Sequence, residues 1–230
     1  MSTMRFVCLL ASTLATAAVL MAVAQSPALQ RGISVEMAVT NNAAPMPDAD
    51  NHDAWIVTVA ADGSLYFGID PVAPDDLADQ MKARPRNRDQ KLYIKADAHA
   101  QFASVKAALG PARASNFEEV VLLASQPESH APRTMVPPKG IDVQLGAPAS
   151  GGAILVQLSG PAQGSTLTVN NRRVSASELG RTLKGFLDNH AQVVEVEAND
   201  AVPFGDIMRV IDEARAAGAI TVALPIFRSL

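Results

Sequence analysis

Residues 92–102 read Leu-Tyr-Ile-Lys-Ala-Asp-Ala-His-Ala-Gln-Phe, and residues 194–204 read Val-Glu-Val-Glu-Ala-Asn-Asp-Ala-Val-Pro-Phe. Both stretches end a strand-like run in Ala, continue with Asp or Asn, and place Phe five residues later. Matching positions between about residue 65 and residue 122 recur at a constant offset of 102. Solenoid repeats have only about 20 to 50 residues, so a period of this length is that of a whole domain. The sequence therefore predicts two related modules.

Each copy also begins with a similar segment. Residues 32–37 read Gly-Ile-Ser-Val-Glu-Met and residues 140–145 read Gly-Ile-Asp-Val-Gln-Leu, and their alternation predicts a leading strand in each copy. The four prolines within residues 126–139 can neither extend a strand ladder nor continue a helix, so this stretch is predicted to be a linker between the copies. The predicted organisation is a tether at 25–31, a first module at 32–125, a linker at 126–139 and a second module at 140–230.

Within each copy the pattern predicts a hairpin, a helix, a strand, a second helix and a final strand. Ala61-Asp62-Gly63 lies between two apolar runs, which is a strong hairpin signal. Residues 175–178 read Ser-Ala-Ser-Glu, a capping box that starts a helix. We expect the second helix of the first copy at residues 98–109, closed by Gly110-Pro111. The predicted fold class is α/β (α+β), with two related two-layer sandwich modules after an N-terminal apolar helix.

The N-terminal apolar segment supports two interpretations. Residues 6–24 carry no charge, and nineteen helical residues would measure roughly 28 Å, which is close to the hydrocarbon thickness of a bilayer. The same segment fits a cleaved signal peptide, because Ala22-Val23-Ala24 is an A-x-A cleavage site before Gln25. Whether residues 1–24 are a transmembrane anchor or a signal peptide, residues 25–230 are expected outside the cytoplasm.

The composition argues against several classes of function. A net charge of −4 and a pI near 5.5 offer no basic surface for nucleic acid. The only cysteine, Cys8, lies in the apolar segment, so neither module holds a disulfide or a thiol nucleophile. The histidines lack the spacing of metal ligands; they are His52, His99, His130 and His190. We therefore expect no catalytic site, cofactor or metal.

The order of these features resembles the ExbD/TolR family of biopolymer transport proteins. The second copy carries the likeness best, in Pro-Phe-Gly-Asp-Ile at residues 203–207 and in Ala-Ala-Gly-Ala at residues 216–219. The first copy keeps Asp97 and Phe102 but has Asn116 where the second has the Gly that ends the helix. The resemblance covers nearly all of residues 1–225, as a tandem duplication that the usual family plan lacks.

This resemblance implies a non-enzymatic subunit of the bacterial inner membrane. Family members work with an ExbB/TolQ-like stator protein and couple the proton-motive force to a TonB- or TolA-like protein. The family's membrane helix follows a cytoplasmic arm and carries a protonatable Asp, whereas residues 6–24 contain no acidic residue. An Asp inside a bilayer costs about 3 kcal/mol on insertion scales and is normally kept only for function. The departure favours an accessory or divergent member; the alternative is a secreted periplasmic module that binds cell wall or peptide, with residues 1–24 removed.

Four residues are the candidates for structural or interaction roles. Asp97 and Asn199 each follow a strand and precede a helix, where a short polar side chain usually caps the helix or closes an Asx turn, with ligand binding as the alternative. Phe102 and Phe204 are expected core anchors. The exposed sheet edges could pair with another chain or capture a TonB-like segment. We also expect the two modules to pair within one chain, since duplication supplies both halves at high effective concentration; a homo-oligomer is the other arrangement.

Overall fold

The computed structural model describes residues 32–87, 89–125, 137–146, 152–160, 166–188 and 193–226. Residues 32–230 form one compact unit. The predicted N-terminal helix and most of the predicted linker lie outside the described residues. Within the described ranges, no helix has the length and apolar character needed to cross a membrane.

The described residues form four α-helices, a short 3-10 helix and the strands of a single sheet. In chain order the elements are β1 (Ala44–Pro45), η2 (Pro47–Asp50), β2 (Trp55–Val59), β3 (Leu65–Phe67), β4 (Asp70–Val72), α2 (Pro74–Ala83), β5 (Leu92–Ala96), α3 (Phe102–Ala114), β6 (Glu119–Ala124), β7 (Lys139–Leu145), β8 (Ile154–Ser159), β9 (Thr166–Val169), β10 (Arg172–Arg173), α4 (Leu179–Leu187), β11 (Val193–Ala198), α5 (Phe204–Ala216) and β12 (Thr221–Leu224). From β2 to β6 and from β8 to β12 the order of strands and helices is the same.

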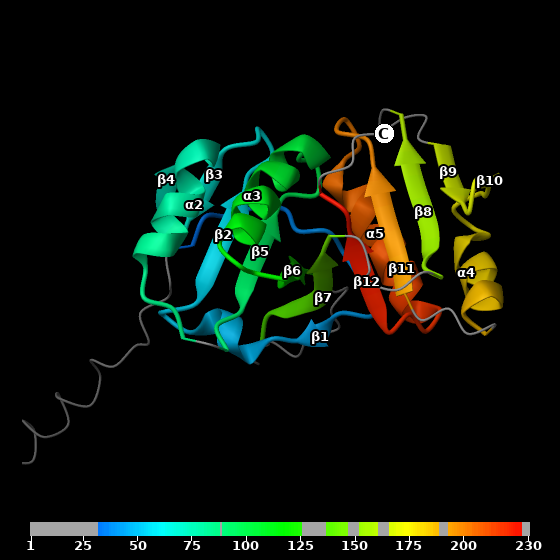
Figure 1. Ribbon diagram of the computed structural model, residues 1–230, viewed down its shortest axis with the longest axis horizontal. Helices are drawn as coiled ribbons and strands as arrows, with labels where there is room; N and C mark the ends of the chain where they lie inside the picture. The colour runs from blue at the N-terminus through cyan, green and yellow to red at the C-terminus, as the bar shows by residue number, and fades with distance from the viewer. Residues whose placement is uncertain are drawn as a thin grey trace, which may run out of the picture. The chain divides into compact units, whose positions relative to one another are not determined.

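All the strands belong to one mixed sheet. Its order is β10-β9-β8-β11-β12-β7-β6-β5-β2-β3-β4, with β1 paired to the start of β7 (Figure 1). In the first copy β2, β5 and β6 run parallel, and in the second copy β8, β11 and β12 do the same. Strand β7 pairs antiparallel with β6 along its length and parallel with β12 through Gln144 and Leu145. The strands of the two copies are thus joined through β7.

The helices pack in pairs over the strands of their own copy. Helix α2 packs on α3, which contacts β2 and β5, and α4 packs on α5, which contacts β11 and β12. Side chains of both copies belong to one apolar cluster, in which Leu109 of α3 and Ile211 of α5 are fully buried. The core therefore continues from one copy into the other.

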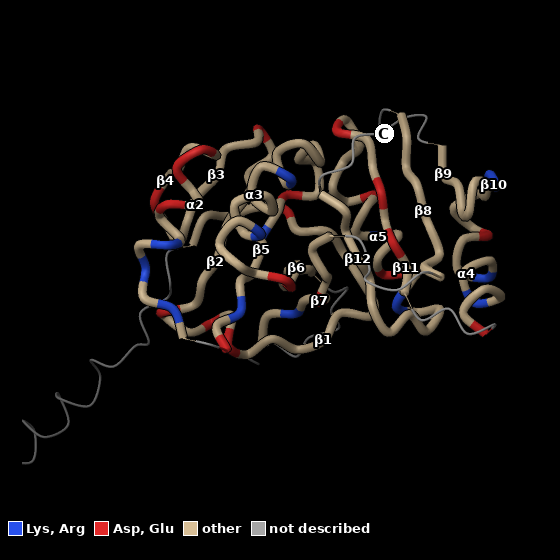
Figure 2. The backbone as a smooth tube through the Cα atoms, viewed as in Figure 1, with Lys and Arg blue, Asp and Glu red and all other residues tan. Residues whose placement is uncertain are grey.

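The sheet face that points away from this core differs between the copies. In the first copy Met46 and Ala49 pack there against Tyr93 of β5. In the second copy β11 places the buried carboxylates Glu195 and Glu197 on that face, because they alternate with core residues along the strand. Figure 2 shows these acidic positions in the middle of β11. One face is apolar and the other polar, so the copies are not equivalent.

Of two local predictions, the hairpin is confirmed and the helix cap only in part. Strands β2 and β3 form the hairpin expected around Asp62-Gly63. The predicted capping box is only half formed: the Glu178 carboxylate accepts hydrogen bonds from the Ser175 amide at 3.2 Å and the Ser175 hydroxyl at 2.6 Å, but the Glu178 amide donates to the Ser175 carbonyl. Helix α4 begins one turn later, at Leu179, without a side-chain cap. The local sequence was sufficient for the hairpin because an Asp-Gly turn signal acts within a few residues.

The predicted bounds of the second helix are wrong. Helix α3 spans Phe102–Ala114 and continues through Pro111, although a proline past the first turn lacks an N–H for the helix and crowds the preceding turn. The turn at residues 97–101 is held by contacts to the other copy, described below. After helix α3 the chain turns at Asn116, whose φ is +62°. After helix α5 it turns at the matching Gly218, whose φ is +102°.

The leading strand predicted for the first copy is also wrong. Only Met37 and Val39 make isolated bridges, to Asp97 and Ser125. The matching segment of the second copy is β7, which occupies the position beside β6. Because β7 fills that position, the segment at residues 33–39 lies outside the ladder.

A substitution at Gly140 tests how closely β7 packs on β6. A Cβ at this position would lie 2.5 Å from Val121 Cγ1 and 3.0 Å from the Leu122 carbonyl oxygen. We expect Gly140→Ala to lower the free energy of unfolding by about 1–3 kcal/mol, as overpacking does. Urea unfolding checks this, with Gly185→Ala as the matched control, because a Cβ at Gly185 meets nothing within 4 Å. Equal stability of the two variants would contradict the packing described here.

Candidate functional site

The turns that follow β5 and β11 meet each other. Four main-chain hydrogen bonds cross between the copies and hold the starts of α3 and α5 together. They are Phe102 N to Val202 O at 2.9 Å, Phe204 N to Ala100 O at 2.8 Å, Ala103 N to Asp200 O at 3.1 Å and Gly205 N to Ala98 O at 2.8 Å. The first two bonds are related by the repeat offset, and so are the last two. The contact therefore has approximate two-fold symmetry about the bridge between Gln101 and Pro203.

These bonds occupy amides that a helix start normally leaves without a partner. The first amides of an α-helix have no intrahelical acceptor. Neither α3 nor α5 has a side-chain cap, and carbonyl groups of the other copy accept these hydrogen bonds instead. Each helix start is completed by the opposite copy, so the contact is part of the fold and leaves no free anion site there.

The Asp97 carboxylate closes the turn after β5. Its Oδ1 accepts the His99 amide at 2.9 Å and lies 3.2 Å from His99 Nδ1, while Oδ2 accepts the Glu36 amide at 2.9 Å. Desolvation raises the pKa of Asp97, but the hydrogen bonds from His99 and Glu36 outweigh it and leave the pKa below its usual value. The carboxylate thus forms an Asx turn and holds the segment around Glu36.

Asn199 makes a simpler turn in the second copy. Its Oδ1 accepts the Ala201 amide at 3.1 Å, and no bond to the leading segment accompanies it among the described residues. Phe102 and Phe204 both lie in the apolar core, with 3% and 0% of their surfaces exposed. The structure therefore brings the four candidate residues to one region, in which backbone groups make the contact between the copies.

Charge and close packing reinforce this contact. Lys106 of α3 forms an ion pair with Asp200 of the second copy, and its Nζ lies 5.4 Å from the centre of the Phe102 ring. A Cβ at Gly205 would lie 3.2 Å from the Ala98 Cβ, so the two backbones approach closely. The sequence signal for this contact was the glycine after Phe204, but nothing local identified its partner.

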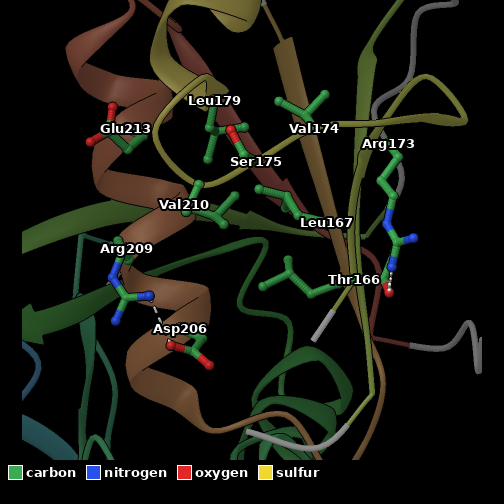
Figure 3. Close-up of a pocket in the computed structure, with 12 residues that line it drawn as sticks. Thr166, Leu167, Arg173, Val174, Ser175, Leu179, Asp206, Arg209, Val210 and Glu213 are labelled. Atoms are coloured by element: carbon green, nitrogen blue, oxygen red, sulfur yellow. Dashed lines mark hydrogen bonds and ion pairs between the residues drawn. The ribbon is translucent and has the colours of Figure 1, made fainter. Parts of the chain in front are cut away.

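A pocket of about 180 Å³ lies within the second copy, between β9, α4 and α5 (Figure 3). Leu167, Leu179 and Val210 form apolar parts of its wall. Figure 3 shows Asp206 paired with Arg209 on α5, at an N–O distance of 3.0 Å. The pocket has a mixed lining, with charged groups on α5 and at Arg173 beside the apolar side chains, and sequence reasoning did not predict it.

The first copy has small residues where α5 lines this pocket. Ser104, Ala107 and Pro111 stand at the positions of Asp206, Arg209 and Glu213. Long side chains hold two helices further apart than small ones. The charged side chains that α5 contributes to this pocket are thus not present at the matching positions of the first copy.

The residues of the pocket show no arrangement for covalent catalysis. Its Ser175 hydroxyl donates to the Glu178 carboxylate in the turn before α4. Over the described parts of the chain, no group of three or more His, Cys, Asp and Glu side chains is placed to hold a metal ion. His130 and His190 lie outside these parts. What the geometry supports best is contact between protein segments.

Comparison with known families agrees with the sequence resemblance. The model of the family described as biopolymer transport protein ExbD/TolR matches residues 9–128 and matches again at residues 124–228. Together the matches cover nearly the whole chain, and the double match is consistent with a tandem duplication. No curated protein matches the chain.

Asp97 gives a pH-dependent test of this site. We expect Asp97→Ala to lower the free energy of unfolding by about 1–3 kcal/mol near pH 7, because it leaves the Glu36 and His99 amides without their acceptor. The pKa of Asp97 is lowered in the folded state, so its contribution is present above the unfolded pKa of about 3.9 and is lost as pH falls through the folded pKa.

Urea unfolding of the wild type and of Asp97→Ala between pH 2 and pH 8 measures the difference in their free energies of unfolding. The stability difference should be constant above about pH 5 and should shrink below about pH 4. Asp79→Ala is the control, since Asp79 is exposed and lies 3.9 Å from Lys82. A difference between wild type and Asp97→Ala that grows as the pH falls would contradict the assignment.

Proposed function

The chain belongs to the ExbD/TolR family of biopolymer transport proteins, and we propose that it is a divergent member acting as an interaction subunit of a TonB- or Tol-type transport system. Members of this family are non-enzymatic transport proteins. The observation that carries the proposal is the double family match, whose first part begins at residue 9, inside the apolar segment. The subunit would bind other proteins in a system driven by the proton-motive force.

The proposed location is the bacterial inner membrane. Residues 6–24 would cross it once and residues 25–230 would lie in the periplasm, with modules at 32–125 and 140–230 and a linker at 126–139. The length and lack of charge of residues 6–24 support an anchor. The proposed partners are an ExbB/TolQ-like membrane protein and a TonB- or TolA-like protein, as in the family generally.

An accessory role follows from the apolar segment. Residues 6–24 contain no acidic side chain, and a proton-coupling membrane helix needs a group that can gain and lose a proton. The proposed subunit therefore contributes binding, and another subunit of the complex carries the proton step. The close contact of the two copies supports this role, because one chain then supplies a paired surface without a second copy.

A second candidate function is a secreted periplasmic binding module. The Ala22-Val23-Ala24 sequence before Gln25 favours it, because signal peptidases cleave after small residues in this pattern. The pocket in the second copy would then be the place to look for a cell-wall or peptide ligand. The two candidates differ in whether residues 1–24 remain attached.

Fractionation of cells that express the full chain separates these candidates. The membrane-subunit proposal predicts extraction only by detergent, an N-terminus at Met1 or Ser2, and copurification of a protein with several membrane spans. Ala24→Leu should leave all three results unchanged, because a leucine is tolerated in a membrane helix but blocks A-x-A cleavage. A soluble protein that begins at Gln25, and that Ala24→Leu converts to a longer membrane-bound form, would refute the proposal.

A further inference from the structure

The segment at residues 33–42, here called the strap, is attached to the folded body in an unusual way. It begins just after residue 31, where the compact unit at 32–230 starts. The matching segment in the second copy is β7, which is paired with strands on both sides. The strap has only the isolated bridges at Met37 and Val39. One copy of the same sequence motif is therefore central to the sheet, and the other lies beside it.

The strap is held to the first copy by hydrogen bonds of its backbone groups, and its Ala38 side chain packs in the apolar core. Lys95, Asp97 and Ser125 of the first copy hold it at three successive points. These bonds are Lys95 Nζ to Ile33 O at 2.7 Å, Glu36 N to Asp97 Oδ2 at 2.9 Å, Ala98 N to Glu36 O at 2.8 Å, Ser125 N to Ala38 O at 2.9 Å and Thr40 N to Ser125 O at 2.8 Å. A short row of separate contacts opens more easily than a continuous ladder, because each contact can be lost without the next.

The end of the strap is held by the second copy. The buried Asp212 carboxylate on α5 accepts the Asn41 amide at 2.9 Å and the Asn42 amide at 2.8 Å. The Asn42 side chain also donates to Asp212 Oδ1 at 3.0 Å. Hydrogen bonds to a charged acceptor are stronger than neutral ones. The matching residue of the first copy is Gly110, so only the second copy has this acceptor.

Next to this strong contact the strap contains an unfavourable one. Thr40 has no exposed surface, and its Oγ1 has no hydrogen-bond partner within the described structure. A buried hydroxyl without a partner regains hydrogen bonds to water when the segment opens. Its neighbour Val39 is 62% exposed. The closed strap is therefore destabilised at Thr40 and held at Asp212.

We propose that the strap is a releasable connection whose latch is Asp212. Residues 33–42 open as a segment while the sheet stays folded, and the Asp212 carboxylate sets how often they open. Opening lengthens the connection between residue 31 and the body by up to roughly 33 Å, at about 3.3 Å for each extended residue. This inference does not depend on the transport role, because it concerns only the attachment of the segment.

Amide hydrogen exchange of the full chain in detergent, measured residue by residue, tests the proposal. The amides of Glu36 and Thr40 should exchange at least about tenfold faster than that of Ile94 in β5, because local opening exposes them without global unfolding. Thr40→Val should slow their exchange about tenfold, since it removes the buried hydroxyl. Asp212→Asn should speed exchange at Asn41 and Asn42 about tenfold and leave Ile94 unchanged.

Two further variants keep the test decisive. Asn42→Ala removes the side-chain bond to Asp212 without touching the core, so it should speed exchange of the strap even if Asp212→Asn fails to fold. Asp79→Asn, at an exposed site on α2, should change nothing. Protection of the strap amides equal to that of Ile94 would overturn the proposal, and so would strap exchange that Thr40→Val leaves unchanged.

Discussion

The two-sided pairing of β7 is the constraint on which the rest of the structure depends. A strand at the edge of a sheet has unpaired amides and carbonyls along one side. Strand β7 covers that side of β6, and it pairs with β12 through Gln144 and Leu145. Because one strand serves both copies, their sheets and their apolar cores become continuous. Each copy alone would leave an unpaired strand and an open core.

The same pairing explains why two similar segments have different roles. When β7 lies beside β6, the leading segment of the first copy has no ladder to join, and Asp97, Ser125 and Asp212 hold it instead. Elsewhere the copies keep approximate symmetry, as the paired turns before α3 and α5 show. Duplication thus preserved the contact between helix starts and released one strand for another use. In this chain that segment lies between the body and residues that are proposed to lie in the membrane.

Local sequence signals predicted the helices and strands well, but they predicted poorly which distant segments those elements contact. The Asp62-Gly63 turn was readable because it depends on a few neighbouring residues, whereas Ser175 and Glu178 pair as expected but do not cap α4. The end of α3 was not predicted, because the helix continues through Pro111 and ends only where Asn116 provides the left-handed turn. Asp97 was identified as a turn residue, but its bond to Glu36 depends on chain 61 residues away. Asp212 and the pocket beside Arg209 gave no local signal, because their contacts exist only after distant segments pack.

The central claim is that the two copies fold as one unit through β7. Urea unfolding followed by fluorescence of Trp55, the only tryptophan, reports on the first copy, while far-UV circular dichroism reports on both. The account predicts coincident transitions and an m-value that fits the surface of the whole body at residues 32–230. If the Trp55 fluorescence transition were complete while about half of the dichroism signal remained, the copies would unfold separately and the claim would be contradicted. An m-value that fits the surface of one copy alone would contradict it too.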